Sequence, residues 1–317
     1  MKTFIFKIFE FSFITVTITI LILGIFIHKV GFKNSPAMNF TDSYSYNEKL
    51  LFIKHQSSKP EVLSIGSSIT LRNLHSEIIV NELHTDKYLN TASWGIKMNE
   101  AFYLLKLLDN IYDIDKVIIA SNLADFQDGT KIIDYNFIKA YLSNDKAMTF
   151  FYFLKNFNLK YYITNIDYAN YVRTNKHNNE YLNYDHYGMA GLKKQGFNIV
   201  QKNWLYKYLI IPSETAYSYL DSISNYCQSK NMKLYFFESP HREGLVKEFS
   251  LEEKELLEHH IKRIENIIED KHYFVNSSGC TWNDSLFVDG THLSESGAKL
   301  FTQYCFDQIK ARTHNTR

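Results

Sequence analysis

Five short apolar runs, each rich in β-branched or aromatic residues, alternate with longer stretches of helical periodicity along most of the chain. The apolar runs cover residues 62–65, 88–90, 116–120, 233–237 and 272–275. The helical stretches cover residues 76–83, 99–108, 213–229 and 251–269. Because parallel strands need long crossover connections, this alternation predicts a parallel sheet with helices on both faces. The runs are too apolar for a sheet with one solvated face.

Serines mark several of the predicted helix starts. Ser250 is followed three residues later by Glu253, which is the pattern of a capping box. Ser213 begins the helical stretch 213–229, and a further helix is expected to open around Ser294; both serines are predicted to be N-caps. These positions set the helical register on either side of the predicted strands.

The N-terminus carries an uncharged apolar run over residues 11–27. As a helix this run is just long enough to cross a hydrocarbon core of about 30 Å. We predict an uncleaved membrane anchor within residues 1–32, and the alternatives are a cleaved signal peptide and a buried core helix. The run exceeds the apolar core of about 7 to 15 residues that is usual in signal peptides.

The topology of this anchor is weakly determined by charge. Lys2 and Lys7 on one side face Lys29 and Lys33 on the other, so the positive-inside rule does not discriminate. A short N-terminal tail before a large C-terminal part favours a single-pass protein of the cell membrane. We expect the large part to lie outside the cytoplasm.

Composition and charge exclude some classes of partner. The chain of 317 residues is 45% hydrophobic, enough for one sizeable core. Its 35 Lys and Arg against 34 Asp and Glu give a net charge of +1 and no basic footprint, so we exclude nucleic acid as a partner. Cys227, Cys280 and Cys305 form no metal or redox pattern, and we expect small buried hydrophobes.

The predicted domain organisation has three parts. Residues 1–32 form the tail and anchor, residues 33–59 a polar juxtamembrane segment, and residues 60–317 the main domain. The strand-helix alternation breaks at about residues 127–211, which are rich in Tyr, Asn and Phe, and this stretch is read as a long insertion. Its aromatic side chains either stack on sugar rings or pack an ordinary subdomain, and ordinary packing is favoured.

Two stretches at opposite ends of the main domain carry candidate chemistry. The first predicted strand runs into EVLSIGSSIT, where Gly66 and two serines form either a polar turn or the mount of a reactive hydroxyl. Near the C-terminus, FVDGTHLSESGAKLF places Asp289 three residues before His292, a spacing that lets the carboxylate hydrogen-bond one imidazole nitrogen. By itself this spacing also fits a solvated loop histidine, which is the default interpretation. A doubly wound sheet can bring both stretches to the crevice beyond its strand ends.

With these residues in view, the sequence resembles the SGNH hydrolases, also called the GDSL esterase family. The Gly-Asp-Ser-x-Thr block of that family resembles Gly66-Ser67-Ser68-Ile69-Thr70, and the resemblance implies that Ser68 is the nucleophile. Ser67 stands where the family has an aspartate. The Asp-x-x-His block matches Asp289-Gly290-Thr291-His292 without departure.

The two remaining blocks of the family supply donors for an oxyanion hole. Asn90-Thr91-Ala92-Ser93-Trp94-Gly95 is similar to the second block, with Gly95 as the candidate amide donor. Ala120-Ser121-Asn122-Leu123 resembles the Gly-x-Asn-Asp block, retaining Asn122 but neither the glycine nor the aspartate. The resemblance therefore implies an oxyanion hole made by the amides of Ser68 and Gly95 and the side chain of Asn122.

The resemblance implies a flavodoxin-like three-layer sandwich with a five-stranded parallel sheet. It also implies a Ser68-His292-Asp289 triad that needs no cofactor and no metal. Relatives with Gly-Ser-Ser blocks serve alginate acetylation or teichoic-acid D-alanylation at membranes. The expected function is a membrane-anchored serine esterase or O-acyltransferase. Its expected substrates are acyl esters of a cell-envelope or extracellular polysaccharide, with acetyl as the expected acyl group. The alternative is a catalytically inactive SGNH-fold protein for glycan binding or assembly; protein partners are not specified.

Other polar residues have weaker claims to a role. His241 and Arg242 follow the fourth predicted strand and are candidates for substrate contact. His259 and His260 lie in a charged helical stretch, where a solvated face is expected because adjacent helical residues do not converge on a metal. The Asp185-His186 pair in the insertion is also expected to be solvated.

Overall fold

The sheet of this protein has five parallel strands. The computed structural model describes residues 2–30, 35–56, 58–129, 131–174, 182–192, 211–268 and 271–315. The strands are β1 (Val62–Ser64), β2 (Tyr88–Asn90), β3 (Lys116–Ser121), β4 (Lys233–Glu238) and β5 (Tyr273–Asn276). They pair in the order β2-β1-β3-β4-β5, and every pairing is parallel. This is the flavodoxin-like order, and it confirms the predicted fold class.

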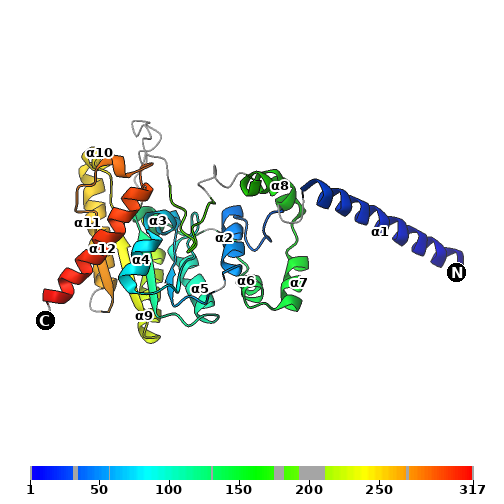
Figure 1. Cartoon of the computed structure of the whole chain (residues 1–317), viewed down its shortest axis with the longest axis horizontal. Helices are drawn as coiled ribbons and strands as arrows, with labels where there is room; N and C mark the ends of the chain where they lie inside the picture. Colours follow the sequence, from blue (N-terminus) through cyan, green and yellow to red (C-terminus); the bar gives the residue numbers. More distant parts are fainter. Residues whose placement is uncertain are drawn as a thin grey trace.

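Helices cover both faces of the sheet (Figure 1). One face packs on α5 (Met98–Asp109), α9 (Glu214–Ser229) and α11 (Leu251–Ile268), which are joined to it by a core that includes Leu104, Leu220, Ile264, Val117 and Phe236. The other face packs on α3 (Ser68–Asn73), α4 (Ser76–Leu83) and α12 (Glu295–Asn315), with a core that includes Ile79, Phe301, Ile118 and Phe237. Successive strand residues point to opposite cores, so the strands are apolar on both sides.

The predicted helix caps are present. The Ser250 and Glu253 side chains each bond the other's backbone amide, as in a capping box. Ser213 accepts from the amide of Thr215, and Ser294 accepts from the amide of Gly297. Predicted burial is correct for Cys227 and Cys305 but wrong for Cys280, which is exposed in the loop after β5.

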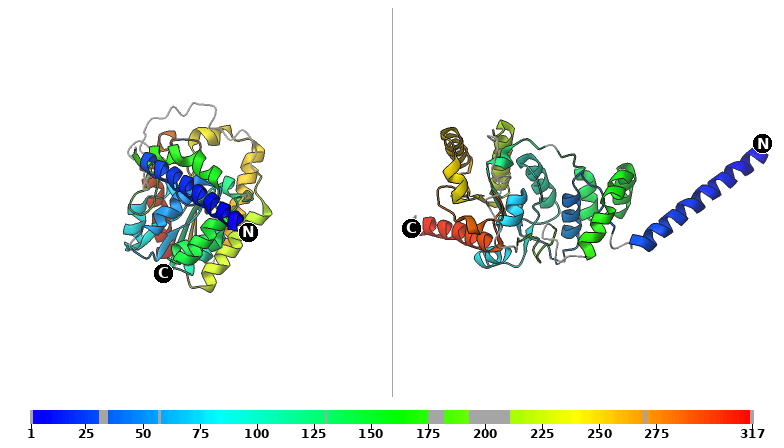
Figure 2. Two further views of the ribbon diagram at one scale, coloured as in Figure 1. Left: turned by 90° about the vertical axis from the view of Figure 1, so that its right-hand side faces the viewer. Right: turned by 90° about the horizontal axis from the view of Figure 1, so that it is seen from above.

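The N-terminal helix α1 (Lys2–Val30) projects away from the rest of the molecule, at the end opposite to α12 (Figures 1 and 2). Residues Lys2–Ile22 have a mean hydropathy of 2.0, and none of this stretch is buried against the protein. The helix is long and apolar enough to cross a membrane, and its position also suits a signal sequence.

Helix α2 (Tyr44–Lys54) lies in the stretch predicted to be a polar juxtamembrane segment. Its Tyr46, Leu50 and Ile53 are buried in the core that includes α5 and α9, so this helix is part of the folded body. The predicted domain boundary at residue 60 stays a prediction. The sequence does not mark α2 as a core helix, because its buried residues also include the polar Ser45, Asn47 and Lys49.

The described part of the predicted insertion is mainly helical. It contains α6 (Tyr135–Leu142), α7 (Lys146–Lys155) and α8 (Leu159–Thr174), while residues 130, 175–181 and 193–210 of the insertion lie outside the described part of the chain. Phe137 and Ile138 of α6 join the core, whereas no residue of α7 is buried. The short helix α10 (Glu243–Glu248) follows β4 and lies near α11, away from α6, α7 and α8 (Figure 1).

Candidate active site

The turn after β1 places Ser68 at the first position of α3. Gly66 has φ +139, and a Cβ there would come within 2.6 Å of Thr70 Oγ1, so the turn needs glycine. Ser67 is extended, and its Oγ accepts from the amide of Ile69 at 3.1 Å, which caps α3. Ser68 is only half-buried, so its hydroxyl can be reached from solvent.

The three residues predicted as a triad lie together beyond the carboxyl ends of the strands. Ser68 Oγ is 2.8 Å from His292 Nε2, and His292 Nδ1 is 2.6 Å from Asp289 Oδ2. A neutral imidazole with its proton on Nδ1 satisfies both bonds, because Nδ1 then donates to the carboxylate and Nε2 accepts from the hydroxyl. The arrangement is that of a serine held against a base that is itself oriented by an acid.

The Asp289 carboxylate is fixed by its own loop. Its Oδ1 accepts from the backbone amides of Thr291 at 2.9 Å and of His292 at 2.7 Å. Burial alone raises the pKa of this carboxyl, but the hydrogen bond and charge of His292 together with these amides outweigh it and hold the pKa below its ordinary value. Asp289 is therefore an anion at neutral pH, as the orientation of the imidazole requires.

Asn73, at the end of α3, holds the loop of Asp289 and His292 in place. Its Nδ2 donates to the carbonyl of Thr291 at 3.0 Å and to Ser239 Oγ at 2.8 Å, and its Oδ1 accepts from the amide of Leu293 at 2.9 Å. One short helix thus carries Ser68 at its start and anchors the histidine loop at its end. The sequence analysis missed Asn73, because its partners are between 166 and 220 positions away.

Asp125 supplies an acid beside the serine turn. Its Oδ2 accepts from Ser67 Oγ at 2.7 Å and from Ser121 Oγ at 3.3 Å. Burial raises the pKa of Asp125, against the lowering effect of Ser67, Lys97 and Ser121. An acid from the loop after β3 thus contacts the serine turn through Ser67, and the sequence analysis missed this residue.

The predicted oxyanion donors lie on the two loops that flank the serine turn. Gly95 has φ +65 and lies two residues after Ser93, whose amide donates to the carbonyl of Gly66 at 3.1 Å. Asn122 is buried directly after β3, and its Oδ1 caps the 3₁₀ turn Leu123–Phe126 by accepting from Ala124. The donor role would use the other end of this amide, Nδ2. Participation of Gly95 and Asn122 in an oxyanion hole stays a prediction.

An aromatic side chain from the loop after β2 lies against the histidine. The rings of Trp94 and His292 are 5.4 Å apart, and the guanidinium of Arg72 lies over the Trp94 ring at 4.2 Å. Trp94 therefore forms one wall beside the imidazole, and the buried stem of Arg72 supports it. The sequence analysis quoted Trp94 within a motif but assigned it no role.

His241 and Arg242 are enclosed in the loop after β4. Both side chains are buried, and Arg242 pairs with Asp284 at 3.3 Å. Burial, reinforced by the charge of His260, lowers the pKa of His241 to about 4, so this ring is neutral at physiological pH. A substrate contact by either residue stays a prediction, and any such contact would have to reach them inside the protein.

The expectation that His260 is solvated is wrong. His260 is fully buried, its Nδ1 is 2.7 Å from Tyr217 Oη, and its Nε2 lies 3.5 Å from Glu238 Oε2. His260 occupies the apolar face of α11 with Ile261 and Ile264, while the charged neighbours occupy the opposite face. His259, Asp185 and His186 are exposed, as predicted.

Glu238, at the end of β4, is a second buried acid that the sequence analysis missed. Neither of its oxygens has a hydrogen-bond partner among the described residues, and the 3.5 Å separation from His260 is long for a hydrogen bond. Burial raises the pKa of Glu238, although His260 opposes the shift. The acid is thus inaccessible from outside and poorly stabilised as an anion.

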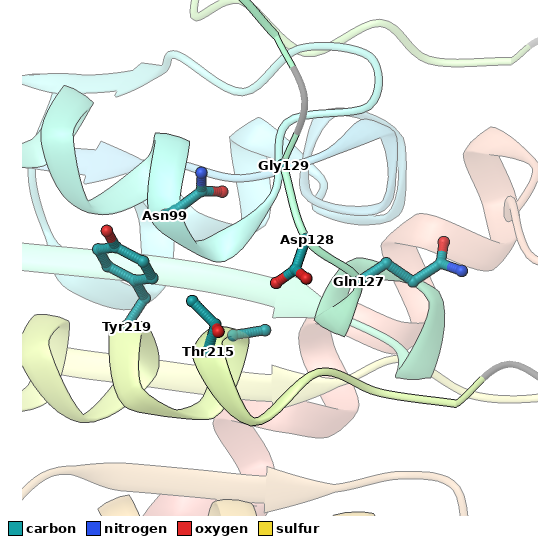
Figure 3. Close-up of a pocket in the computed structure, with 7 residues that line it drawn as sticks. Asn99, Gln127, Asp128, Gly129, Thr215 and Tyr219 are labelled. Atoms are coloured by element: carbon teal, nitrogen blue, oxygen red, sulfur yellow. The ribbon is translucent and has the colours of Figure 1, made fainter.

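A polar recess of about 280 Å³ opens near the loop after β3 (Figure 3). It is lined by Asn99 of α5, by Thr215 and Tyr219 of α9, and by the loop residues Gln127, Asp128 and Gly129. Ser68 and His292 do not line it, so it is not the pocket of the triad. Among the described residues, no three His, Cys, Asp or Glu side chains are grouped to hold a metal ion.

Comparisons with known proteins add little to this geometry. No family model and no curated protein matches the chain. Among solved structures, the chain is similar to a psychrotrophic esterase from Pseudoalteromonas sp., in a structure inhibited by monoethylphosphonate. The TM-score is 0.36 at 12% identity, over 80% of this chain and 99% of that one. A likeness this weak carries no argument, and the case for a function depends on the site.

Proposed function

We propose that this protein is a membrane-anchored SGNH-type serine esterase or O-acyltransferase. The observation that carries the proposal is the contact of Ser68 Oγ with His292 Nε2 at 2.8 Å, with His292 Nδ1 held by Asp289 at 2.6 Å. A serine hydroxyl is a weak nucleophile near neutral pH, and a neutral imidazole at this distance can take its proton as it attacks.

The reaction begins with attack of Ser68 Oγ on the carbonyl carbon of an ester. The hydroxyl proton passes to His292 Nε2, and the imidazolium that forms is stabilised by the Asp289 carboxylate. The tetrahedral intermediate then expels the alcohol, which takes that proton from Nε2. The acyl group is left on Ser68 as an ester. Asp289 remains ionised throughout, in line with its lowered pKa.

The second half of the reaction runs in the reverse sense with a new acceptor. His292 takes a proton from water or from a sugar hydroxyl, whose oxygen attacks the acyl-serine, and the proton returns to Ser68 Oγ as the acyl group leaves. Water as acceptor makes the protein an esterase, and a sugar hydroxyl makes it an O-acyltransferase. In both halves the amides of Ser68 and Gly95 and Asn122 Nδ2 would stabilise the oxyanion.

The proposed substrate is an acyl ester, acetyl in the first instance, of a cell-envelope or extracellular polysaccharide. Support comes from the resemblance of the Gly-Ser-Ser block to membrane-linked relatives and from an N-terminal helix long enough to cross a bilayer. In this proposal the helix anchors the protein in the cell membrane and the catalytic domain lies outside the cytoplasm.

The test uses the full-length chain in detergent, incubated with a serine-directed phosphonate and, separately, with p-nitrophenyl acetate. We expect one phosphonate per chain, located on Ser68 by peptide mass mapping, and release of p-nitrophenol. Ser68→Ala should abolish both. Ser218→Ala, at an exposed serine of α9, is the matched control and should change neither.

The outcomes separate the proposed function from its alternative. Labelling at Ser68 with turnover supports the enzyme, and addition of acetylated and unacetylated glycans then distinguishes hydrolysis from transfer. Absence of labelling and turnover in a folded chain would reject the enzyme. If that chain still bound polysaccharide, the catalytically inactive glycan-binding protein would replace it.

A further inference from the structure

The outer surface of α7 and α8 carries large apolar side chains that face water. Six of them leave between 51% and 65% of their area exposed, and they are Phe150, Phe151, Leu154, Phe157, Leu159 and Ile163. We refer to these six residues as the α7–α8 face. Single exposed apolar residues are common on proteins, but a cluster of this size on two consecutive helices indicates an interaction surface.

The opposite surface of α7 is packed against the protein, which fixes the direction of this face. Tyr152 stacks on the ring of Phe137, which is buried in the core, and Phe153 also packs there. Phe157 lies against the rings of Phe153 and Tyr162, at 5.5 Å from each. The inner aromatic side chains therefore hold the helices, and the six apolar side chains of the α7–α8 face, Phe157 included, still leave more than half of their area exposed.

The segment that follows α1 is tied to the turn between α7 and α8. Asn39 donates through Nδ2 to the carbonyl of Asn156 at 2.6 Å and accepts through Oδ1 from Tyr162 Oη at 3.2 Å. Tyr161 Oη donates to the carbonyl of Ala37 at 3.2 Å. These bonds connect the two helices to the chain within nine residues of the end of α1 at Val30 (39 − 30 = 9).

This connection limits how far the face can lie from the end of α1. Ala37 is seven positions after Val30 (37 − 30 = 7), and a fully extended chain covers at most about 25 Å over that length. In Figure 1 α7 and α8 lie at the end of the body from which α1 projects, whereas α12 lies at the other end. If α1 crosses a bilayer, the α7–α8 face is within reach of its surface.

We propose that the α7–α8 face inserts into the interfacial region of the bilayer that α1 crosses. The proposal rests on the membrane anchor in the proposed function and adds a second contact that orients the catalytic domain. An apolar helical face enters about 5 to 10 Å into the boundary between headgroups and acyl chains. Lys146, Lys155 and Lys160 flank the face, are exposed, and suit the anionic headgroups beside it.

The consequence is a catalytic domain held in a fixed pose rather than on a free tether. With α1 and the α7–α8 face both at the membrane, rotation of the domain about the anchor is suppressed. The end of the molecule that carries α12 then points away from the bilayer (Figure 2).

The test reconstitutes the full chain into vesicles of phosphatidylcholine and phosphatidylglycerol. In a Cys280→Ser background, which removes the exposed thiol, Phe151→Cys is labelled with an environment-sensitive fluorophore. Leu300→Cys is the matched control, because Leu300 is also an exposed apolar residue but lies on α12. We expect lipids with spin-labelled acyl chains to quench the probe at position 151 by about two-fold or more and the probe at 300 very little.

Equal, weak quenching at both positions in chains that float with the vesicles would overturn the proposal. So would energy transfer between two probes at position 151 without lipid quenching, which would assign the face to a second copy of the chain. Failure of the chain to float would overturn both the anchor and this contact. Phosphonate labelling of Ser68 in the same vesicles reports separately on the catalytic part of the proposed function.

Discussion

Two acid-histidine pairs lie at the same edge of the sheet, and their surroundings differ in every respect that matters for catalysis. In the pair of Asp289 and His292, the nitrogen and oxygen are 2.6 Å apart, and the second ring nitrogen reaches the hydroxyl of Ser68. In the pair of Glu238 and His260, the nearest approach is 3.5 Å, and the second ring nitrogen reaches Tyr217.

The carboxylates differ in solvation as well as in partner. Asp289 accepts two backbone amides and an imidazole, and its pKa is lowered in spite of burial. Glu238 accepts no hydrogen bond from the described residues, and burial raises its pKa. An acid beside a histidine is therefore not sufficient for catalysis. Catalysis needs an anion held by donors and an imidazole with one nitrogen open to a nucleophile.

The largest expected effect separates the two pairs directly. Asp289→Asn should lower kcat by about ten-thousand-fold, because an amide no longer fixes the tautomer or stabilises the imidazolium. Glu238→Gln, the matched acid-to-amide change in the other pair, should leave kcat within about three-fold. The measurement is kcat for p-nitrophenyl acetate, with circular dichroism to confirm the fold. Equal losses in the two variants would erase the distinction between the pairs.

The next largest effect tests whether Asn122 acts as an oxyanion donor beside the pair of Asp289 and His292. Asn122→Ser keeps an oxygen that can cap the Leu123–Phe126 turn but removes the amide donor. We expect kcat to fall by two to three orders of magnitude, about 2.7 to 4 kcal/mol of transition-state stabilisation, with KM little changed. A variant with unchanged kcat would remove Asn122 from the site.

A smaller effect tests how the serine turn depends on Asp125. Loss of this carboxylate leaves Ser67 Oγ without its 2.7 Å partner, which weakens the cap of α3 beneath Ser68. Asp125→Ala, which removes the acceptor, should reduce kcat by about ten- to one-hundred-fold, an effect of roughly 1.4 to 2.7 kcal/mol. In a cycle with Ser67→Ala, the two losses should be non-additive by at least about 0.5 kcal/mol. Additive losses would mean that Asp125 acts through a different contact.

Glu238→Gln is expected to have the smallest effect on activity, but it should change how the stability of the protein depends on pH. Because the folded-state pKa of Glu238 is raised, the stabilising contribution of its protonated form is complete below the unfolded pKa of about 4.3 and is lost as pH rises through the folded value. Glu238→Gln removes this loss. Thermal unfolding should show the variant more stable at pH 7 by about 1 to 3 kcal/mol and similar to wild type near pH 4. A variant that is less stable at pH 7 would show that the anion is needed.

The sheet and the Asp289–His292 arrangement could be predicted because local patterns specify them. The five strands agree with the predicted runs to within one or two residues, since each is a short apolar run between polar or turn-forming stretches. The Asp289-x-x-His292 spacing permits this hydrogen bond within one loop, and the family resemblance, rather than the spacing, favours it over a solvated histidine. The position of Ser68 after β1 was likewise readable, because Gly66 and Ser67 interrupt the apolar run.

The supporting contacts could not be predicted because they join distant parts of the chain. Ser67 and Asp125 are 58 residues apart, and Asn73 and Thr291 are 218 residues apart, so no local sequence pattern indicates either contact. His260 is a different kind of miss. It shares a helical stripe with Leu257, Ile261 and Ile264, and that periodicity outweighed the charged composition on which the expectation was based.

The most direct test that Ser68 and His292 act together in catalysis is a double-mutant cycle between them in the full-length chain. The quantity to measure is kcat/KM for p-nitrophenyl acetate in wild type, Ser68→Ala, His292→Ala and the double variant, with the uncatalysed rate subtracted. If the two side chains act as one unit, each single change should remove nearly all of the activity and the double variant should be no slower than either. Substantial activity in either single variant, or losses that multiply in the double variant, would contradict the account.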